Sequence, residues 1–379
     1  MTSPLPVGPT SRRWRRIDRA ILVAVFVALW VPAALLLAGV HASQIENRPL
    51  ATLPPVTLGG LADGTWAAGV DAFVEDNIAP RGLAVRLRGR AYLAVHSTGS
   101  TQVIAGRGAW LFPRDALDPT CRHTAADVAA ALDSAMDLAG RGITFRFLAI
   151  PDKQSIYPAQ LESNPFPVGC TEQQRAALRQ AIADHATIAL DGWSLLQGIP
   201  RGSGPTLLYY PRDTHWTALG AIPVLKALVT SIQPGLWSDA DVVEDGTWRH
   251  RSDLTRQLGV TTFDRTTKVV VRGDVAVTTT NLSLPFELKN EAAVFETRTS
   301  TTRPVVEGRA LIVYDSFFGT QSALIAPWFR DAVWVHIGDL QEHPEIAQLT
   351  GPFSVVVVAR VERFLYLDDM QAVVRIVGS

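Results

Sequence analysis

The chain has 379 residues, which is enough for two ordinary domains or for one large domain with additions. Its formal net charge is -1, so no global electrostatic field would recruit nucleic acid or an acidic polymer. The two cysteines do not form a Cys-x-x-Cys motif and cannot build a zinc site by themselves. Neither a glycine-rich phosphate loop nor a metal-binding motif is present, so no cofactor is predicted.

The N-terminal segment predicts a membrane anchor. Five arginines precede an uncharged apolar stretch, residues 20–40. As a helix, this stretch would rise roughly 31 Å, which is enough to span a hydrocarbon core of about 30 Å. Because the arginines lie on its N-terminal side, we expect residues 1–19 to stay cytoplasmic and the rest to lie outside. A cleaved signal peptide is the alternative, but its apolar core would normally be shorter.

Residues 41–99 are expected to connect this segment to the main domain. Residues 41–65 are rich in proline, glycine and small side chains, which is typical of a linker. In residues 67–96, apolar side chains recur at near-helical intervals, with an interruption at Pro80. This part therefore predicts an amphipathic helical lead-in.

From about residue 100 onward, strand and helix patterns alternate. Thr124 and Asp127 predict a capping box for one helix, and Thr171 and Gln174 predict another. Strands are expected at residues 144–150, 187–190, 310–314, 332–337 and 353–359, with a further helix at 217–232. Continuous apolar runs such as Val355–Val358 are typical of parallel strands that are buried on both faces. The pattern therefore predicts an α/β domain over residues 100–379, with a parallel sheet flanked by helices.

Residues 245–305 interrupt this rhythm. The segment 266–279 alternates between polar and apolar residues and contains Arg272-Gly273-Asp274, a turn signal between two valine-rich runs. We therefore expect a β-rich insertion within the main domain.

Two short motifs could carry chemistry. The first is Asp213-Thr214-His215-Trp216, and the second is Asp315-Ser316, which follows an apolar run. Serine needs a histidine base to become a nucleophile, and the histidine needs a carboxylate to fix its tautomer. Residues i and i+2 of an extended segment point the same way, so Asp213 can orient His215. The alternative is two unrelated loops, with Ser316 only capping a helix.

The positions of the motifs favour a common site. The Pro151-Asp152-Lys153 segment and Asp315-Ser316 each follow the carboxyl end of a predicted strand. Ligands of open α/β sheets bind beyond these ends. The Asp213–Trp216 motif directly precedes a predicted helix, whose N-terminal N–H groups can support an acid or bind an anion.

Six segments in a fixed order resemble the family of alginate O-acetyltransferase proteins, which have SGNH hydrolase-like domains. They are residues 46–51, residues 73–77, residues 103–112, the Pro151–Pro158 loop, Asp213–Trp216 and Asp315–Phe317. The resemblance implies an SGNH-like fold in which Ser316 is the nucleophile, His215 the general base and Asp213 the orienting acid. It also implies substrate-binding or supporting roles for Asp152, Lys153, Tyr157, Trp216, Tyr314 and Asp315. The family usually has glycine where Tyr314 stands, so the shape of the oxyanion pocket is expected to differ.

The function implied by the resemblance is O-acetyl transfer to hydroxyls of an exported or cell-surface polysaccharide, outside the cytoplasm. A membrane-bound acyltransferase would be the partner that supplies the acetyl group. Two alternatives remain open. The same triad could hydrolyse acetyl esters, or the protein could be a noncatalytic glycan-binding subunit of an export complex. In a glycan-binding subunit, four tryptophans would be important as sugar-stacking platforms more than as core residues. They are Trp110, Trp193, Trp216 and Trp248.

Cys121 and Cys170 follow the predicted anchor, in a compartment where disulfides persist. They can pair with each other in only one way, which predicts a disulfide. Two free buried thiols are the alternative.

Overall fold

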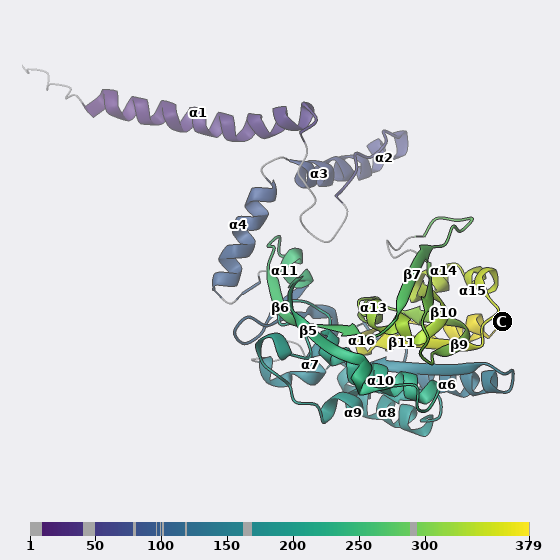
Figure 1. Cartoon of the computed structure of the whole chain (residues 1–379). Coiled ribbons are helices and arrows are strands. Elements are labelled where there is room, and N and C mark those ends of the chain that lie inside the picture. The colour runs from purple at the N-terminus through teal and green to yellow at the C-terminus, as the bar shows by residue number, and fades with distance from the viewer. Residues whose placement is uncertain are drawn as a thin grey trace, which may run out of the picture. The chain divides into compact units, whose positions relative to one another are not determined.

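The computed structural model describes residues 10–40, 50–78, 81–95, 97–98, 100, 102–117, 120–161, 169–288 and 294–378. The chain divides into two compact units (Figure 1). The first contains Met1–Val95 together with Arg256–Val260, and the second contains His96–Thr255 and Thr261–Ser379.

The first unit is helical. Its elements are α1 (Thr10–Leu37), α2 (Leu58–Asp63), α3 (Thr65–Asn77) and α4 (Arg81–Ala94). The helical lead-in thus forms separate helices α3 and α4, on either side of the predicted interruption; Pro80 itself lies outside the described residues, as do linker residues 41–49. The backbone of Leu258 packs closely against α4 at Gly89. Only glycine fits there, because a Cβ would lie 2.1 Å from the carbonyl oxygen of Leu258.

Most of the apolar stretch predicted as a membrane anchor, residues 20–37, belongs to α1. This helix begins at Thr10 and ends at Leu37. Within the described ranges, no helix has both the length and the apolarity that crossing a membrane requires. The predicted membrane-spanning helix over residues 20–40 is therefore not confirmed.

The second unit is built on a seven-stranded sheet with the strand order β4-β3-β11-β9-β10-β8-β7. Its strands are β3 (Thr144–Ile150), β4 (Ala189–Asp191), β7 (Ala276–Asn281), β8 (Phe295–Ser300), β9 (Val306–Tyr314), β10 (Phe329–His336) and β11 (Val355–Val361). The strands from β4 to β10 are parallel, whereas β8 and β7 are antiparallel to their neighbours. The predicted parallel sheet is present, and β3 has the predicted bounds.

Helices pack on both faces of this sheet. The longest are α6 (Ala125–Ala139), α8 (Cys170–Asp184), α10 (Ala218–Ile232) and α17 (Met370–Val377). Val356 and Val358 belong to the core that contains α6, α8 and α17, whereas Val355 and Val357 belong to the core that contains α10. Alternate side chains of β11 therefore face opposite layers, as expected for a strand buried on both faces.

The remaining elements are shorter. The helices are α5 (Arg114–Leu117), α7 (Lys153–Ile156), α9 (Gly192–Gln197), α11 (Asp253–Gln257), α12 (Ser316–Gly319), α13 (Ser322–Ile325), α14 (Ile337–Glu342), α15 (Glu345–Thr350) and α16 (Glu362–Leu365). The 3-10 helices are Pro158–Gln160, Gly204–Thr206, Asp239–Asp241 and Ala326–Trp328. The strands β1 (Val103–Ala105) and β2 (Leu111–Pro113) form an antiparallel pair.

The predicted insertion divides into two parts. β5 (Val242–Arg251) and β6 (Phe263–Val271) form a separate antiparallel pair, whereas β7 and β8 extend the main sheet. The chain bends after β6, and Gly273 adopts φ 107° there, a value that favours glycine. However, β6 and β7 do not pair with each other. The alternating pattern determines which side chains share a face, but it does not determine the partner strand.

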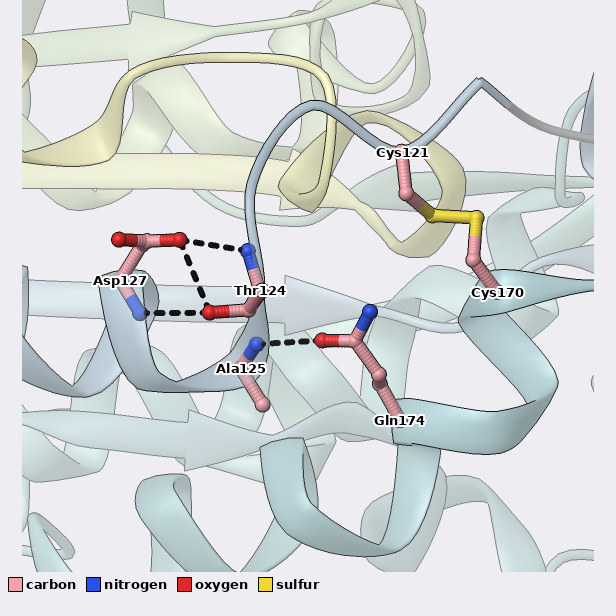
Figure 2. Close-up of a disulfide and its surroundings, with 6 residues drawn as sticks. All are labelled: Cys121, Thr124, Ala125, Asp127, Cys170 and Gln174. Atoms are coloured by element: carbon pink, nitrogen blue, oxygen red, sulfur yellow. Dashed lines mark hydrogen bonds between the residues drawn. A yellow bond between two sulfur atoms is a disulfide. The ribbon is translucent and has the colours of Figure 1, made fainter.

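The predicted disulfide joins Cys121 to Cys170, the first residue of α8 (Figure 2). The capping box of α6 is formed by Thr124 and Asp127 as predicted. The second capping box is absent: Gly169 precedes α8, and the side chain of Gln174 instead accepts a hydrogen bond of 2.8 Å from the backbone N–H of Ala125. The disulfide and this hydrogen bond both connect the beginnings of α6 and α8.

Candidate active site

Polar residues follow the carboxyl ends of three neighbouring parallel strands. Asp152 and Lys153 follow β3, Ser316 follows β9, and Arg363 follows β11. The last residues of β3 and β11 are paired in the sheet register, so these loops begin side by side. This edge of the sheet is where open α/β folds place their ligand sites.

The Asp213–His215 segment reaches this region on a tight turn. An isolated antiparallel bridge joins Tyr209 to Trp216, and the N–H of Tyr210 donates to the carbonyl of His215 at 3.2 Å. Within the turn, Nδ1 of His215 lies 2.8 Å from Oδ1 of Asp213. A carboxylate cannot donate, so Nδ1 carries the proton and Nε2 is left as the basic nitrogen.

Nε2 of His215 is buried and has no hydrogen-bond partner in the described part of the chain. A buried imidazole nitrogen without a partner is costly, and it is suited to receive a proton from an incoming hydroxyl. Ser316 therefore donates no hydrogen bond to this nitrogen in the structure.

The carboxylate of Asp213 is fully engaged. Besides His215, it accepts a hydrogen bond from the backbone N–H of Asp253 at 2.7 Å and lies 3.1 Å from Nε2 of His250. Burial by itself would raise the pKa of Asp213, but the hydrogen bonds from His215 and His250 outweigh it and hold the pKa well below its usual range. Asp213 therefore remains ionised beside the imidazole.

The pKa of His215 is shifted in the opposite direction. Burial would lower this pKa, but the hydrogen bond and the negative charge of Asp213 raise it above its usual value of 6.5. Asp213 therefore stabilises the imidazolium that forms when His215 accepts a proton.

This shift predicts the pH dependence of acetyl-ester turnover. A histidine can act as a base only when it is neutral, so any turnover that uses His215 as its base should fall as the pH decreases through the raised pKa, with a midpoint above 6.5. The measurement is kcat/KM against pH, with the melting temperature followed over the same range. A midpoint at or below 6.5 in the folded protein would contradict this assignment.

The sequence did not indicate His250 or Asp253. His250 lies on β5, and Asp253 begins α11 immediately after this strand. Oδ1 of Asp253 accepts a hydrogen bond of 2.7 Å from the N–H of Thr214, and Oδ2 lies 3.8 Å from Nδ1 of His215. Burial, followed by the charge of Asp213, raises the pKa of Asp253. Neither residue belongs to a recognisable sequence motif. Their contacts with Asp213 and Thr214 arise only in the folded chain, where the end of β5 lies beside the turn that carries Asp213.

Asp213, His215 and Asp253 each offer one atom that could ligate a metal ion, and these atoms lie within 4.8 Å of one another. However, Nδ1 of His215 and Oδ1 of Asp213 are already hydrogen-bonded to each other. Oδ2 of Asp213 also accepts a hydrogen bond from the backbone N–H of Asp253. The arrangement fits a hydrogen-bonded acid–base pair better than a metal site.

Lys153 holds the turn in place. Its ammonium is buried and donates to the backbone carbonyls of Tyr210, Pro211 and Asp213, at 3.2, 3.2 and 2.7 Å. Burial lowers the pKa of Lys153 to about 8, while nearby acids such as Asp253 oppose this shift. These hydrogen bonds connect the loop after β3 to the turn that carries Asp213 and His215.

Other predicted supporting residues connect the same loops. Asp152 forms a buried ion pair with Arg363, and the Arg363 guanidinium lies 5.4 Å from the ring centroid of Phe317. The hydroxyl of Tyr157 accepts a hydrogen bond of 2.9 Å from the N–H of Leu208. The indole N–H of Trp216 donates to the carbonyl of Phe317 at 2.8 Å.

Ser316 is exposed and is the first residue of α12. The cap of this helix is Asp315, whose Oδ1 accepts from the N–H groups of Phe317 and Phe318 at 3.0 and 3.3 Å. Ser316 is therefore not the capping residue. The ring of Phe317 lies 5.0 Å from that of His215, centroid to centroid, so α12 contacts His215.

Tyr314 and Asp315 point away from the acid–base pair. Oδ2 of Asp315 accepts a hydrogen bond of 2.7 Å from the N–H of Val361. The ring of Tyr314 is buried against Phe295 and Trp334. A Cβ at Gly319 would lie 2.7 Å from the Tyr314 ring, so the tyrosine is accommodated because the following helix ends in glycine.

A pocket of about 370 Å³ opens beside His215. Tyr210, Trp248 and His250 line it from one side, and Gln321 lines it from the segment after α12. The ring of His250 is stacked on that of Tyr210 with a centroid distance of 4.0 Å. The site therefore combines an oriented histidine, an exposed serine at a helix start and a pocket with aromatic walls.

The fold is that of an SGNH-like α/β domain, and comparison with known proteins identifies the family. Residues 103–297, about half of the chain, match the family described as "SGNH hydrolase-like domain, acetyltransferase AlgX". The chain belongs to this family, which confirms the resemblance found in its sequence.

Similar proteins carry related descriptions. The probable alginate O-acetylase AlgJ of Azotobacter vinelandii is 24% identical over 175 residues, 45% of this chain and 44% of that protein. The matched segment thus spans less than half the length of that relative. The structure of Bacillus cereus PatB1 with a sulfonyl adduct has a TM-score of 0.50 and 13% identity, covering 71% of this chain and 99% of the other. The O-acetyltransferase domain of Pseudomonas putida AlgJ has a TM-score of 0.43 and 20% identity, covering 70% and 92%.

Proposed function

We propose that this protein is an O-acetyltransferase that transfers acetyl groups to hydroxyls of a polysaccharide through Ser316, His215 and Asp213. Family membership supports acetyl transfer. The observation that carries the assignment of residues is the pair of Asp213 and His215, whose unpartnered Nε2 is buried beside the segment that bears Ser316.

In the first half of the proposed reaction, the Ser316 hydroxyl attacks the carbonyl carbon of an acetyl donor. Its proton passes to Nε2 of His215, and Asp213 stabilises the resulting imidazolium. The N–H of Ser316 is a natural oxyanion donor, because the first residues of a helix have no intrahelical acceptor. One such donor contributes about 3–4 kcal/mol to transition-state stabilisation. The donor's leaving group then departs with the proton from His215, and the acetyl group remains on Ser316.

In the second half, a sugar hydroxyl attacks the acetyl carbonyl. His215 accepts the proton of this hydroxyl and returns it to the Ser316 oxygen as the tetrahedral intermediate collapses. The product is an acetylated sugar and a free Ser316. Water in place of the sugar would give acetate, which is the esterase alternative.

One assay distinguishes these activities. The purified full-length protein is incubated with a chromogenic acetyl ester, with and without an oligosaccharide acceptor. Acetylated oligosaccharide supports the proposed transferase. Free acetate alone indicates an esterase, and no turnover of either kind indicates a noncatalytic glycan-binding subunit.

The proposal includes a location outside the cytoplasm and a membrane-bound acyltransferase that supplies the acetyl group. The Cys121–Cys170 disulfide supports this location, because such bonds persist in oxidising compartments. Attachment to the membrane through residues 20–40 is supported by the sequence pattern alone.

A labelling experiment tests the location. In cells, a reporter fused after Ser379 should be extracytoplasmic, and Cys121 and Cys170 should react with thiol labels only after reduction. The variant Cys121→Ser is the control, because it leaves the Cys170 thiol without its partner and open to labelling. A cytoplasmic reporter signal would contradict the proposed location.

A further inference from the structure

The pocket beside His215 contains an exposed tryptophan. Trp248 is 49% exposed, although most large aromatic side chains of this unit are buried. It lines the pocket together with His250, two residues further along β5. Alternate residues of a strand share a face, so β5 presents both rings to the pocket. Between them, Arg249 lies instead over the ring of Phe263, with a distance of 4.4 Å to the centroid.

The pocket offers little free positive charge. Lys268 is the lysine among its lining residues, and its ammonium is hydrogen-bonded to the carboxylate of Asp245. No arginine lines the pocket within the part of the chain that the structure describes. Asp213, which remains ionised, is hydrogen-bonded to two of the lining residues, His215 and His250. An anionic group that entered here would have to displace Asp245 from Lys268 to pair with this lysine, so it would gain less than it would from an unpaired cation.

We propose that this pocket is the acceptor subsite and that it takes a neutral sugar unit rather than a uronate. The inference rests on the proposed acetyl transfer. The indole face of Trp248 provides an apolar surface for one face of a pyranose ring. The amide of the buried Gln321 can hydrogen-bond to sugar hydroxyls, and His215 lies close enough to activate one of them. Alginate, which the name of the relative from Azotobacter vinelandii mentions, is a polyuronate, so this chain would differ from that protein in its acceptor.

Direct binding tests the subsite without requiring turnover. Full-length protein carrying Ser316→Ala is titrated by calorimetry with a neutral hexose oligosaccharide and with an oligouronate of equal length. The neutral oligosaccharide should bind at least about tenfold more tightly than the oligouronate. Adding Trp248→Ala should weaken binding of the neutral oligosaccharide by about tenfold or more, because stacking of a pyranose ring depends on the aromatic face of the indole. The matched control is Phe263→Ala: this ring lies on the neighbouring strand, is 40% exposed and does not line the pocket.

A second variant tests the role of charge. Asp245→Asn should release Lys268 and improve binding of the oligouronate, with little effect on the neutral oligosaccharide. Tighter binding of the oligouronate to the parent protein, or equal binding with and without Trp248, would overturn the proposal. Turnover of a chromogenic acetyl ester by the protein with Ser316 intact tests the proposed chemistry separately, so failure of the subsite and failure of the function are distinguishable.

Discussion

Ser316→Ala should abolish acetyl-ester turnover and leave the fold intact. The variant removes the hydroxyl that would form the acetyl-enzyme, and we expect a loss of roughly 10⁴-fold or more. Because Ser316 is exposed and the helix cap is provided by Asp315, the substitution should change the melting temperature little. The measurement is turnover of a chromogenic acetyl ester together with thermal unfolding.

Ser322→Ala is the matched control for this variant. Ser322 is also the first residue of a short helix, α13, in the same part of the chain, but unlike Ser316 it is not adjacent to Phe317, whose ring contacts that of His215. Its replacement should leave turnover unchanged. If the Ser316→Ala variant retains more than about a tenth of the parent activity, Ser316 is not the nucleophile.

Asp213→Asn should reduce turnover by several orders of magnitude. An asparagine cannot stabilise the imidazolium of His215, and it permits the wrong tautomer, for which a loss of about 10⁴-fold is typical. It should also remove the cause of the raised pKa of His215, so the midpoint of the pH profile should move to lower pH. The variant should also lose stability, because the amide group would confront the N–H of Asp253, at a cost of about 1–3 kcal/mol.

Asp315→Asn is the comparison that identifies the acid of the relay. Asp315 accepts hydrogen bonds from Phe317, Phe318 and Val361, so its replacement should also cost about 1–3 kcal/mol of stability. Melting temperatures alone therefore do not separate the two acids. Turnover, measured at a temperature where both variants are folded, does. A large catalytic loss confined to Asp315→Asn would show that Asp315, and not Asp213, orients the base.

Local features of this chain could be predicted from the sequence because their causes are local. The strand at 144–150 and the cap formed by Thr124 and Asp127 depend on residues that are close together in the sequence. The contact between Asp213 and His215 also belongs to this class, since side chains at i and i+2 point the same way. The disulfide followed from there being only two cysteines.

Only the tertiary structure decided which distant segments complete the site. His250 and Asp253 reach Asp213 because β5 pairs with β6 and returns the chain to the turn, and the carbonyls that bind Lys153 come from a segment about 60 residues away. Likewise, β7 pairs with β8 rather than with β6, although a turn signal at Gly273 separates β6 from β7 in the sequence. Periodicity determines which face of an element is buried, but the partner is set by packing between segments far apart in the chain, which no local pattern contains.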